Sequence, residues 1–404
     1  MQSTKQHVLV VGGRDHTLVK LDKMGIEYSM IQVPELVTQK QIHESRRYLV
    51  MDYTRIDEVV AVARTWHGID RFDAIVSFAE HGMHAASVCA IELGLPGANL
   101  SAVVQTRDKI KMRALLAEHG VATVAYQPCD TIEEAAEFLR RMGNKPIILK
   151  PYAGGGSAGV ARVAEPDELA AAWAWARAST QDRILAEEFI EGPEYSVESV
   201  SAHGRHEVAM ITEKLTNGAP HFIELGHQVP PRLHEGTQAQ VRAMVVRFLE
   251  LIDQKVSPAH TEIRLTPEGP KIIESQTRIG GDQIWEMCEM VSGVDQMSEA
   301  IANLLGRPAP QRTPRASAAA IRFFALENVR VDAVNGIDLA TASPGVVRVN
   351  CTLNPGAELG PLKWSESRQG YVLCTGDDVH AAIANAEHAL GQVRVETSPL
   401  AQAA

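Results

Sequence analysis

The sequence predicts a multidomain protein that combines a parallel α/β domain with α+β domains. Short apolar strands alternate with helical segments over residues 1–105, which is typical of a parallel sheet with crossover helices. Strand-like runs follow one another through 194–214, and two more flank residues 267–269, which favours antiparallel pairing. Three prolines between residues 308 and 314 then indicate a boundary before a C-terminal module. A chain of 404 residues has room for about two to four domains with separate cores.

The first domain, residues 1–105, is expected to be Rossmann-like. Gly12 and Gly13 follow its first strand, but Arg14 comes next and no GxGxxG motif continues. A dinucleotide site needs that third glycine, so we favour an ordinary tight turn over the site of a nicotinamide-dependent dehydrogenase. The expected strands cover 7–11, 28–33 and 74–78, and the expected helices cover 17–24, 56–66 and 85–93.

Three further units are expected, over residues 106–190, 191–310 and 311–404. Gly120 ends the first helix of the second unit as a C-cap would. The final residues, 397–404, are expected to form a frayed tail. The expected helices cover 108–118, 133–142, 167–178 and 238–251, and the expected strands cover 146–150, 184–189, two runs within 194–214 and a hairpin around 267–269.

Composition excludes several function classes. Lys and Arg number 39 and Asp and Glu 50, which gives a formal charge of −11. Nucleic acids and anionic membranes need clustered cations, so neither is expected as a partner. Five cysteines without CxxC spacing fit reduced thiols better than disulfides or a zinc site. No apolar run approaches the ~20 residues of a membrane helix and the first strand is too short for a signal peptide, so we expect a cytoplasmic protein.

The most glycine-dense segment of the chain follows Lys150 directly. Gly154, Gly155 and Gly156 precede Ser157, so the backbone N–H groups are unobstructed and can surround phosphates. The strand before the loop would place the Lys150 ammonium at its mouth. The motif is not a P-loop, because the lysine precedes the glycines. A flexible hairpin turn with a solvated lysine is an equally weighted alternative.

An acidic cluster follows the next strand. An apolar strand that ends in carboxylates can pair its edge with a purine, while one acidic side chain accepts from a ribose hydroxyl. A solvent-facing charged turn is the ordinary alternative, but this cluster lies across a helix from the glycine loop, as a nucleotide cleft requires. The residues concerned are Glu187, Glu188, Phe189, Ile190 and Glu194.

The expected hairpin around 267–269 carries the residues most typical of a metal site. Glu262 and Glu274 should approach each other across it, and alternation places Glu274, Gln276 and Arg278 on one face. Two carboxylates and a carboxamide oxygen are ligands that Mg²⁺ accepts. An arginine beside them can hold a phosphoryl group or an oxyanion. A solvated polar face is the less favoured alternative, because these groups interrupt apolar runs.

Glu224 and His227 place a carboxylate and an imidazole beside an expected strand end. A single histidine is more often a structural group than a ligand. Paired with Glu224, this one could equally orient a substrate or carry a proton.

In this order, the segments resemble the ATP-grasp superfamily of carboxylate–amine ligases over residues 8–305. The resemblance rests on Asp108-Lys109, Met112-Arg113, Lys150 before the glycine loop, and Glu187-Glu188-Phe-Ile-x-Gly-x-Glu194-x-Ser. The segments Glu224-x-Gly-His227-x-x-Pro230 and His260-Thr-Glu262 are most similar to the L-amino-acid ligases, which make dipeptides. The resemblance implies an ATP-grasp fold: an N-terminal Rossmann-like domain, a central lid and a C-terminal antiparallel-sheet catalytic domain.

The resemblance also implies a role for each candidate residue. Phosphates would be held by Lys109, Lys150 and the loop Gly154, Gly155, Gly156 and Ser157; adenine by Glu187 and the backbone through Glu188, Phe189 and Ile190; and ribose by Glu194. Mg²⁺ would be held by Glu262, Glu274 and Gln276, while Arg278 would steady the acyl phosphate and the tetrahedral intermediate. Substrates and catalysis would involve Glu224, His227, Glu80, Gly280 and Gly281.

We therefore predict an ATP- and Mg²⁺-dependent ligase that joins two amino acids through an acyl phosphate, with two metal ions and Mn²⁺ as an acceptable replacement. Many ligases of this size are homodimers. The superfamily usually has Asn where this chain has Gln276, which sets the carboxamide one methylene further out. The alternatives are a ligase or biotin-carboxylase-like enzyme acting on another carboxylate and a protein that binds ATP without turnover. The bicarbonate segment of a biotin carboxylase is missing after Glu194.

Overall fold

The structure is a computed structural model that describes residues 5–219 and 221–400. Its N-terminal unit is a four-stranded sheet in the order β3-β2-β1-β4. All three strand pairs are parallel, as predicted. The strands are β1 (His7–Val11), β2 (Glu27–Gln32), β3 (Tyr48–Val50) and β4 (Ala74–Val76), and the helices are α1 (Asp15–Lys23), α2 (Gln39–Glu44), α3 (Ile56–Ile69) and α4 (Met83–Leu93).

The helices α5 (Leu100–Arg107) and α6 (Lys109–Glu118) lead from this unit to a second sheet of order β5-β8-β6-β7, which we call the lid together with its two helices. Asp108 caps α6, and Thr131 forms a capping box with Glu134 at the start of α7. The lid comprises β5 (Tyr126–Cys129), α7 (Ile132–Arg141), β6 (Ile147–Pro151), β7 (Ala161–Val163), α8 (Leu169–Ala178) and β8 (Ile184–Glu188).

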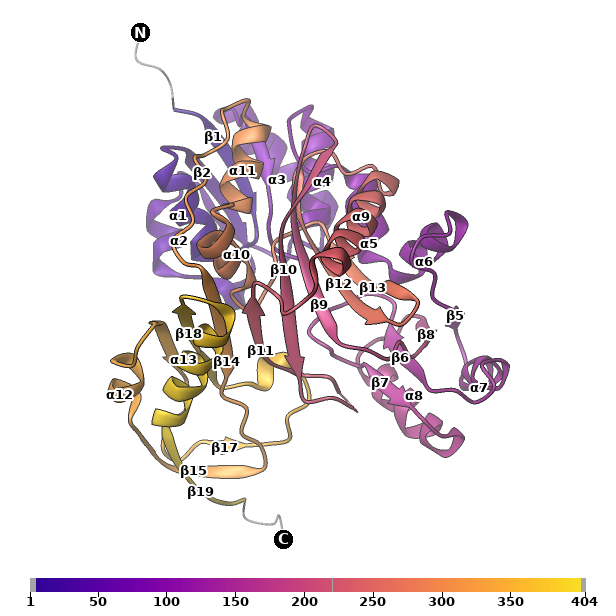
Figure 1. The fold of residues 1–404 in the computed structure, drawn as a ribbon. Helices are drawn as coiled ribbons and strands as arrows, with labels where there is room; N and C mark the ends of the chain where they lie inside the picture. The colour runs from indigo at the N-terminus through magenta and orange to yellow at the C-terminus, as the bar shows by residue number, and fades with distance from the viewer. Residues whose placement is uncertain (1–4, 220, 401–404) are drawn as a thin grey trace.

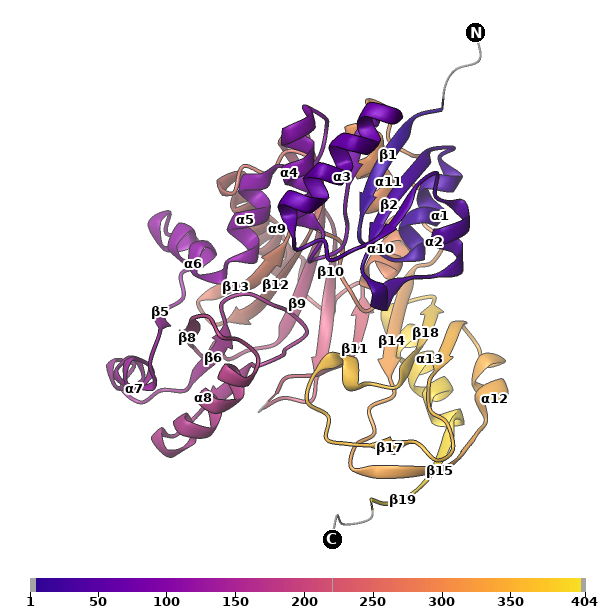
Figure 2. The ribbon, with the colours of Figure 1, turned by 180° about the vertical axis from the view of Figure 1, so that it is seen from behind.

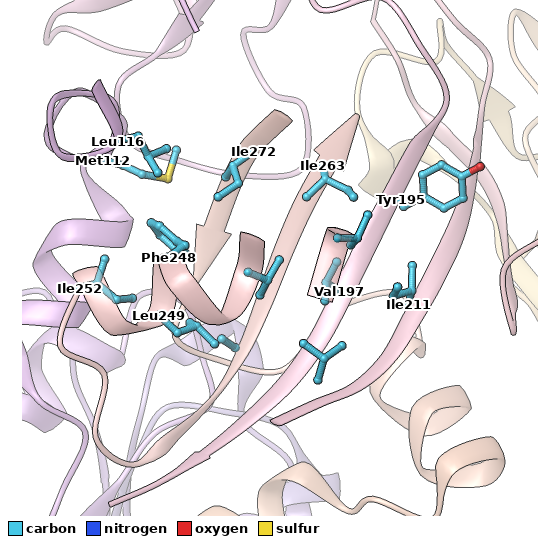
Figure 3. Close-up of a cluster of buried hydrophobic side chains, with 14 of the residues drawn as sticks. Met112, Leu116, Tyr195, Val197, Ile211, Phe248, Leu249, Ile252, Ile263 and Ile272 are labelled. Carbon is cyan, nitrogen blue, oxygen red and sulfur yellow. The ribbon is translucent and has the colours of Figure 1, made fainter. Parts of the chain in front are cut away.

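The central sheet has eight strands in the order β13-β12-β9-β10-β11-β14-β18-β16. Its first part contains β9 (Glu194–Ala202), β10 (Arg205–Thr216), β11 (Glu224–Val229), α9 (Glu235–Leu251), β12 (Ser257–Thr266) and β13 (Gly269–Gln276). The face covered by α9 is the core shown in Figure 3, where Phe248 and Leu249 pack against strand residues such as Val197 and Ile263. Met112 and Leu116 of α6 join the same core.

Two helices, α10 (Ile284–Ser292) and α11 (Gln296–Leu304), follow β13. Met297 and Ile301 of α11 pack with Val8 and Val10 of β1, so this helix ties the N-terminal sheet to the central unit. In Figures 1 and 2 the lid and the C-terminal residues lie on opposite sides of the central strands, with the N-terminal sheet above them. No helix in the described part of the chain is long and apolar enough to cross a membrane.

The C-terminal residues continue the central sheet rather than forming a separate layer. The strand β14 (Ala318–Phe323) pairs with β11, and β18 (Gly370–Gly376) and β16 (Val346–Cys351) follow it. A small sheet of order β17-β15-β19 and the helices α12 and α13 complete this part, with bounds β15 (Val329–Asn335), α12 (Ile337–Thr341), β17 (Glu358–Leu359), α13 (Val379–Gln392) and β19 (Arg394–Pro399). The domain boundaries at 105/106, 190/191 and 310/311 stay predictions.

The expectation of a frayed tail was wrong for residues 397–399. These residues belong to β19, where Thr397, Ser398 and Pro399 pair with β15. Pairing with β15 satisfies backbone groups that a free tail would leave to water, which holds this segment in place. The rest of that expectation, beyond residue 400, falls outside the described residues. The predicted fold class, mixed α/β with a parallel N-terminal sheet and antiparallel sheets elsewhere, is confirmed.

Candidate functional site

A cleft with an empty volume of about 880 Å³, including space open to solvent, lies between the lid and the central sheet. Its walls come from the lid strands, the glycine-rich loop and the cleft-facing residues of the central strands. All eleven residues predicted to bind a nucleotide line it: Lys109, Lys150, Gly154, Gly155, Gly156, Ser157, Glu187, Glu188, Phe189, Ile190 and Glu194. Glu224, Glu262 and Glu274 line it as well, whereas Glu80, His227, Gln276, Arg278, Gly280 and Gly281 do not.

The two predicted phosphate-binding lysines are buried and paired. The Nζ atom of Lys109 lies 3.0 Å from a Glu274 oxygen and donates to the Gly154 carbonyl at 2.9 Å. Although burial alone would lower the pKa of Lys109, Glu274 raises it above its usual value. The Nζ atom of Lys150 lies 2.8 Å from Glu187, yet burial lowers the pKa of Lys150. Both cations therefore face the cleft with internal counterions.

The carboxylate of Glu187 is held by two cations. Arg113 on α6 donates to its two oxygens at 2.6 and 3.0 Å, and Lys150 approaches from the other side. These contacts use three of about four acceptor positions of the carboxylate, and through them the side chain joins the lid to α6. In the described structure the N–H of Ile190 makes no hydrogen bond.

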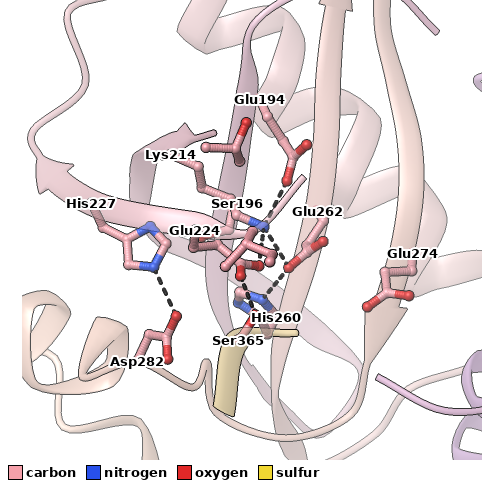
Figure 4. A network of polar contacts seen from close by, with 12 residues as sticks. Glu194, Ser196, Lys214, Glu224, His227, His260, Glu262, Glu274, Asp282 and Ser365 are labelled. Carbon is pink, nitrogen blue, oxygen red and sulfur yellow. Dashed lines mark hydrogen bonds and ion pairs between the residues drawn. The ribbon is translucent and has the colours of Figure 1, made fainter. Parts of the chain in front are cut away.

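Lys214, which the sequence analysis did not single out, lies at the centre of an acidic cluster (Figure 4). Its Nζ atom is 2.7 Å from Glu194, 2.8 Å from Glu262 and 3.5 Å from Glu224. Burial opposes the charge, but the three carboxylates raise the pKa of Lys214 well above its usual value. Arg264 also holds Glu194, through contacts of 3.0 and 3.1 Å. A permanent cation thus joins the positions predicted for ribose, metal and substrate.

The predicted metal-binding residues lie together at the end of the β12–β13 hairpin. Glu262 and Glu274 are directly paired in the sheet register. Gln276 donates from Nε2 to Glu274 at 2.7 Å, while its buried Oε1 has no partner within the described structure. No group of three or more His, Cys, Asp or Glu suited to a metal occurs among the residues described. Two carboxylates plus an unsatisfied carboxamide oxygen fit a hard cation that is also held by phosphate oxygens.

His260 lies in β12, two residues before Glu262 and opposite Gln276 in the sheet register. Its Nδ1 lies 2.7 Å from Glu198 and its Nε2 3.3 Å from Glu262. Burial would lower the pKa of His260, but Glu198 and Glu262 raise it to about 9. Gly280 packs against the same group, since a Cβ atom there would lie 2.9 Å from the His260 ring. Gly281 has open space around it and contributes exposed backbone instead.

Glu224 is the first residue of β11 and so lies at a strand end as predicted, whereas His227 lies inside the strand. His227 is buried, and its Nε2 lies 3.2 Å from Asp282 while its Nδ1 has no partner within the described structure. Burial opposes ionisation of Asp282, but His227 and Arg368 lower the pKa of that carboxyl. The expected alternation does not extend to Arg278, because β13 ends at Gln276.

Arg278 pairs instead with the other distant candidate, Glu80. Its Nε donates to Glu80 at 3.0 Å and its Nη1 to the Ile279 carbonyl at 2.7 Å. Arg107 contacts Glu80 as well, through the Glu80 carbonyl at 3.1 Å. The N-terminal unit therefore supplies an acid to the end of the hairpin, next to Gly280.

Comparisons with known proteins agree with this geometry. A family model for the ATP-grasp domain matches residues 143–286, and one for L-amino acid ligase C-terminal domain 2 matches residues 322–398. The crystal structure of an L-amino acid ligase from Bacillus licheniformis has a TM-score of 0.83 at 20% identity, covering 98% of this chain and 99% of that one. The chain therefore contains an ATP-grasp domain and has the ATP-grasp fold.

Two curated relatives of this ATP-grasp protein act on different substrates by name. Alanine–anticapsin ligase of Bacillus subtilis is 26% identical over 275 residues, which cover 62% of this chain and 56% of that protein. Formate-dependent phosphoribosylglycinamide formyltransferase of Mycolicibacterium vanbaalenii is 24% identical over 414 residues, which cover 97% of this chain and 96% of that protein. The chain thus spans little more than half of the first relative. The comparisons support a ligase.

Acid should weaken this ATP-grasp fold through Glu187. Burial opposes its ionisation, but Arg113 and Lys150 lower the pKa of Glu187 to about 2, below the usual 4.5. The resulting stabilisation is complete above about pH 4.5 and disappears as the pH falls through about 2. In urea unfolding, Glu187→Gln should have a lower unfolding free energy than the wild type at neutral pH. Between about pH 5 and pH 3 the variant should lose less unfolding free energy than the wild type does. Glu133 is exposed, so Glu133→Gln is the control and should have the pH dependence of the wild type. If Glu187→Gln lost as much unfolding free energy in acid as the wild type, the lowered pKa assigned to Glu187 would be contradicted.

Proposed function

We propose that the protein is an ADP-forming ligase that joins the carboxylate of one L-amino acid to the amine of a second. A carboxylate oxygen attacks the γ-phosphorus of ATP, which gives an acyl phosphate and ADP. The second amine then attacks the acyl carbon, phosphate leaves with the bonding electrons, and the amine loses a proton. The observation that carries the proposal is the cleft in which Lys109, Lys150 and the glycine loop face the in-register pair Glu262 and Glu274.

The chain's own residues would mainly position the reactants and balance charge. We propose Lys109 and Lys150 as phosphate partners, with Glu187 and Glu274 as the counterions they exchange for phosphate. Mg²⁺ held by Glu262, Glu274 and Gln276 would neutralise phosphate charge when bound. The free N–H of Ile190 suits an acceptor nitrogen of adenine, and Glu194 suits the ribose hydroxyls.

For the amino acids, we propose Glu80 and Glu224 as partners of ammonium groups, because each offers a partly exposed carboxylate. Arg278 would stabilise the negative charge that develops on the acyl phosphate and the tetrahedral intermediate. Its Nη2 makes no hydrogen bond in the described structure and is therefore available to an anion. His227 would orient the substrate, with Nε2 held by Asp282. Gly280 and Gly281 would supply backbone N–H groups.

The test is ADP release by the purified protein with Mg-ATP, first with single L-amino acids and then with pairs, together with mass spectrometry of the products. We expect release that requires a pair and a product whose mass is the sum of both minus water. ADP release that needs a single non-amino-acid carboxylate instead would reject the proposal.

A ligase acting on another carboxylate is the second candidate. The alignment with the formyltransferase, which extends over 97% of this chain, favours it. Formate and glycinamide-type amines therefore belong in the same assay. Nucleotide binding without any turnover would instead favour a protein that only binds ATP.

Gln276 offers a test of the metal site. Because its Oε1 has no partner in the described structure, we expect it to be the ligand atom. Gln276→Asn should keep activity within about tenfold, whereas Gln276→Leu should raise the Mg²⁺ concentration for half-maximal activity by at least about tenfold. Ser275→Ala, on the opposite face of β13, is the control and should leave the Mg²⁺ titration unchanged. An unchanged titration for Gln276→Leu would remove Gln276 from the site.

A further inference from the structure

Residues 363–368 of the C-terminal part, which we call the bridging segment, reach the lid at two points. They lie between β17 and β18 and contain one 3₁₀ turn, Ser365–Ser367. The N–H of Ser365 donates to the Gly156 carbonyl of the glycine loop at 3.4 Å. The Nζ atom of Lys363 lies 5.7 Å from the ring centroid of Trp175 on α8. The segment therefore contacts both the loop and a helix of the lid.

The same segment contacts the wall proposed for the amino acids. The Ser365 hydroxyl donates to Glu224, and the contact is visible in Figure 4. Arg368 donates to the Glu224 carbonyl at 3.0 Å and to both Asp282 oxygens at 2.9 and 2.7 Å. Asp282 in turn holds His227. The bridging segment thus connects Gly156 of the glycine loop to Glu224 directly and to His227 through Asp282.

Arg368 holds the backbone of Ser365 in position. Its Nε donates to the Ser365 carbonyl at 2.6 Å, and its guanidinium carbon lies 3.8 Å from the Phe323 ring centroid. Each guanidinium nitrogen therefore has a partner, and the group is packed on an aromatic face. With its carbonyl held, Ser365 directs its hydroxyl at Glu224 and its N–H at Gly156.

We propose that Ser365 is a positioning residue that couples occupancy of the amino-acid site to the glycine loop. The proposal rests on the proposed function, since it takes Glu224 as the partner of a substrate ammonium. Without substrate, Glu224 accepts from the neutral hydroxyl of Ser365, while Lys214 stands 3.5 Å from its other oxygen. An ammonium group donates a stronger, charge-assisted hydrogen bond and displaces the hydroxyl.

We take the 3₁₀ turn to shift when the hydroxyl is displaced, pivoting about the carbonyl that Arg368 holds, and this shift removes the Ser365 N–H from Gly156. The loop is then free to settle on the phosphates, and it has room to do so, because a Cβ atom at Gly154, Gly155 or Gly156 would meet no atom within 4 Å. Coupling between two binding equilibria is reciprocal. Nucleotide that holds the loop away from Ser365 therefore increases the affinity for the amino acid.

The coupling can be measured by calorimetry with the full chain, using the Mg²⁺ complex of a non-hydrolysable ATP analogue and the amino acid that supports ADP release. In the wild type, we expect the amino acid to tighten nucleotide binding by about fivefold or more. In Ser365→Ala the factor should fall toward one, because each ligand alone should then bind about as tightly as it binds the wild type in the presence of the other ligand. Ser365→Thr should restore the coupling.

Ser367→Ala is the matched control, because Ser367 lies in the same turn and its hydroxyl makes no hydrogen bond in the described structure. An unchanged coupling factor in Ser365→Ala would overturn the proposal. Amide hydrogen exchange of residues 152–160 without any ligand separates this outcome from failure of the proposed function. Faster exchange in Ser365→Ala than in Ser367→Ala supports the link between Ser365 and the loop even where no amino acid is a substrate. Equal exchange overturns the link whatever the substrate.

Discussion

Replacing Arg278 by alanine is expected to reduce amide formation by at least about 10²–10³-fold while leaving ATP affinity nearly unchanged. The side chain does not line the nucleotide cleft, and its free Nη2 lies at the end of the hairpin that carries Glu274. Its proposed partner is negative charge that develops only after phosphoryl transfer begins. Loss of this group should therefore lower kcat with little effect on nucleotide binding.

Steady-state kinetics of ADP release and calorimetry with an ATP analogue provide the measurement. Arg107→Ala is the matched control, because Arg107 also contacts Glu80 but leaves the Arg278–Glu80 pair in place. A similar loss of turnover in both variants would indicate that the effect comes from displacement of Glu80 and not from the charge of Arg278. Near-native turnover in Arg278→Ala would remove this residue from the mechanism.

Replacing Lys214 by methionine is expected to cost about 3 kcal/mol of unfolding free energy, because buried carboxylates would lose their shared cation. Two of the carboxylates would retain a cationic partner, since Glu194 contacts Arg264 and Glu262 contacts His260. Glu224 would retain only its hydrogen bond from the Ser365 hydroxyl. The uncompensated negative charge should also weaken ATP binding by at least about tenfold, since it faces the phosphates across the cleft.

Urea unfolding and nucleotide titration measure the two effects. Lys271→Met, which removes a half-buried hairpin lysine outside the acidic cluster and its contact with the Thr123 carbonyl, is the control; it should leave nucleotide binding unchanged and cost much less stability. Adding Glu262→Gln to Lys214→Met should recover part of the stability, because it removes one orphaned charge. A double variant no more stable than the single one would contradict the electrostatic account.

The nucleotide half of the site could be predicted because its residues lie close in sequence. Lys150, the glycine loop and Glu187–Ile190 fall within about forty residues, and the strand periodicity that locates them is local. The pairing of Glu262 with Glu274 follows from a hairpin, which is the shortest-range contact between strands. Most helices and strands up to residue 276 were also predicted, whereas α2, α5, β3, β5 and β7 were missed because they are short or lie at sheet edges, and the individual elements from α10 onward were not predicted at all.

Lys214 could not be predicted in the same way. In β10 it alternates like any strand residue, and only the lateral order β12-β9-β10 brings it to Glu262. Its sequence neighbours Thr212, Glu213 and Thr216 are polar, so no apolar run marks Lys214 as a buried residue. Ser365, Arg368 and Asp282 likewise take part in tertiary contacts between segments about 80 residues or more apart in the sequence. Hydrophobic periodicity locates single helices and strands and does not predict such contacts.

The continuous eight-stranded sheet has a consequence for exchanging parts between related enzymes. The strand that carries His227 is flanked by β14 on one side, in the register Gly226 to Arg322. A chain cut before β14 would expose a row of unpaired N–H and C=O groups along the substrate wall, a template for aggregation. Chimeras that graft a foreign C-terminal part should therefore be joined in the 305–317 connection and keep that register. A one-residue slip would turn Arg322 and every second side chain of β14 to the opposite face.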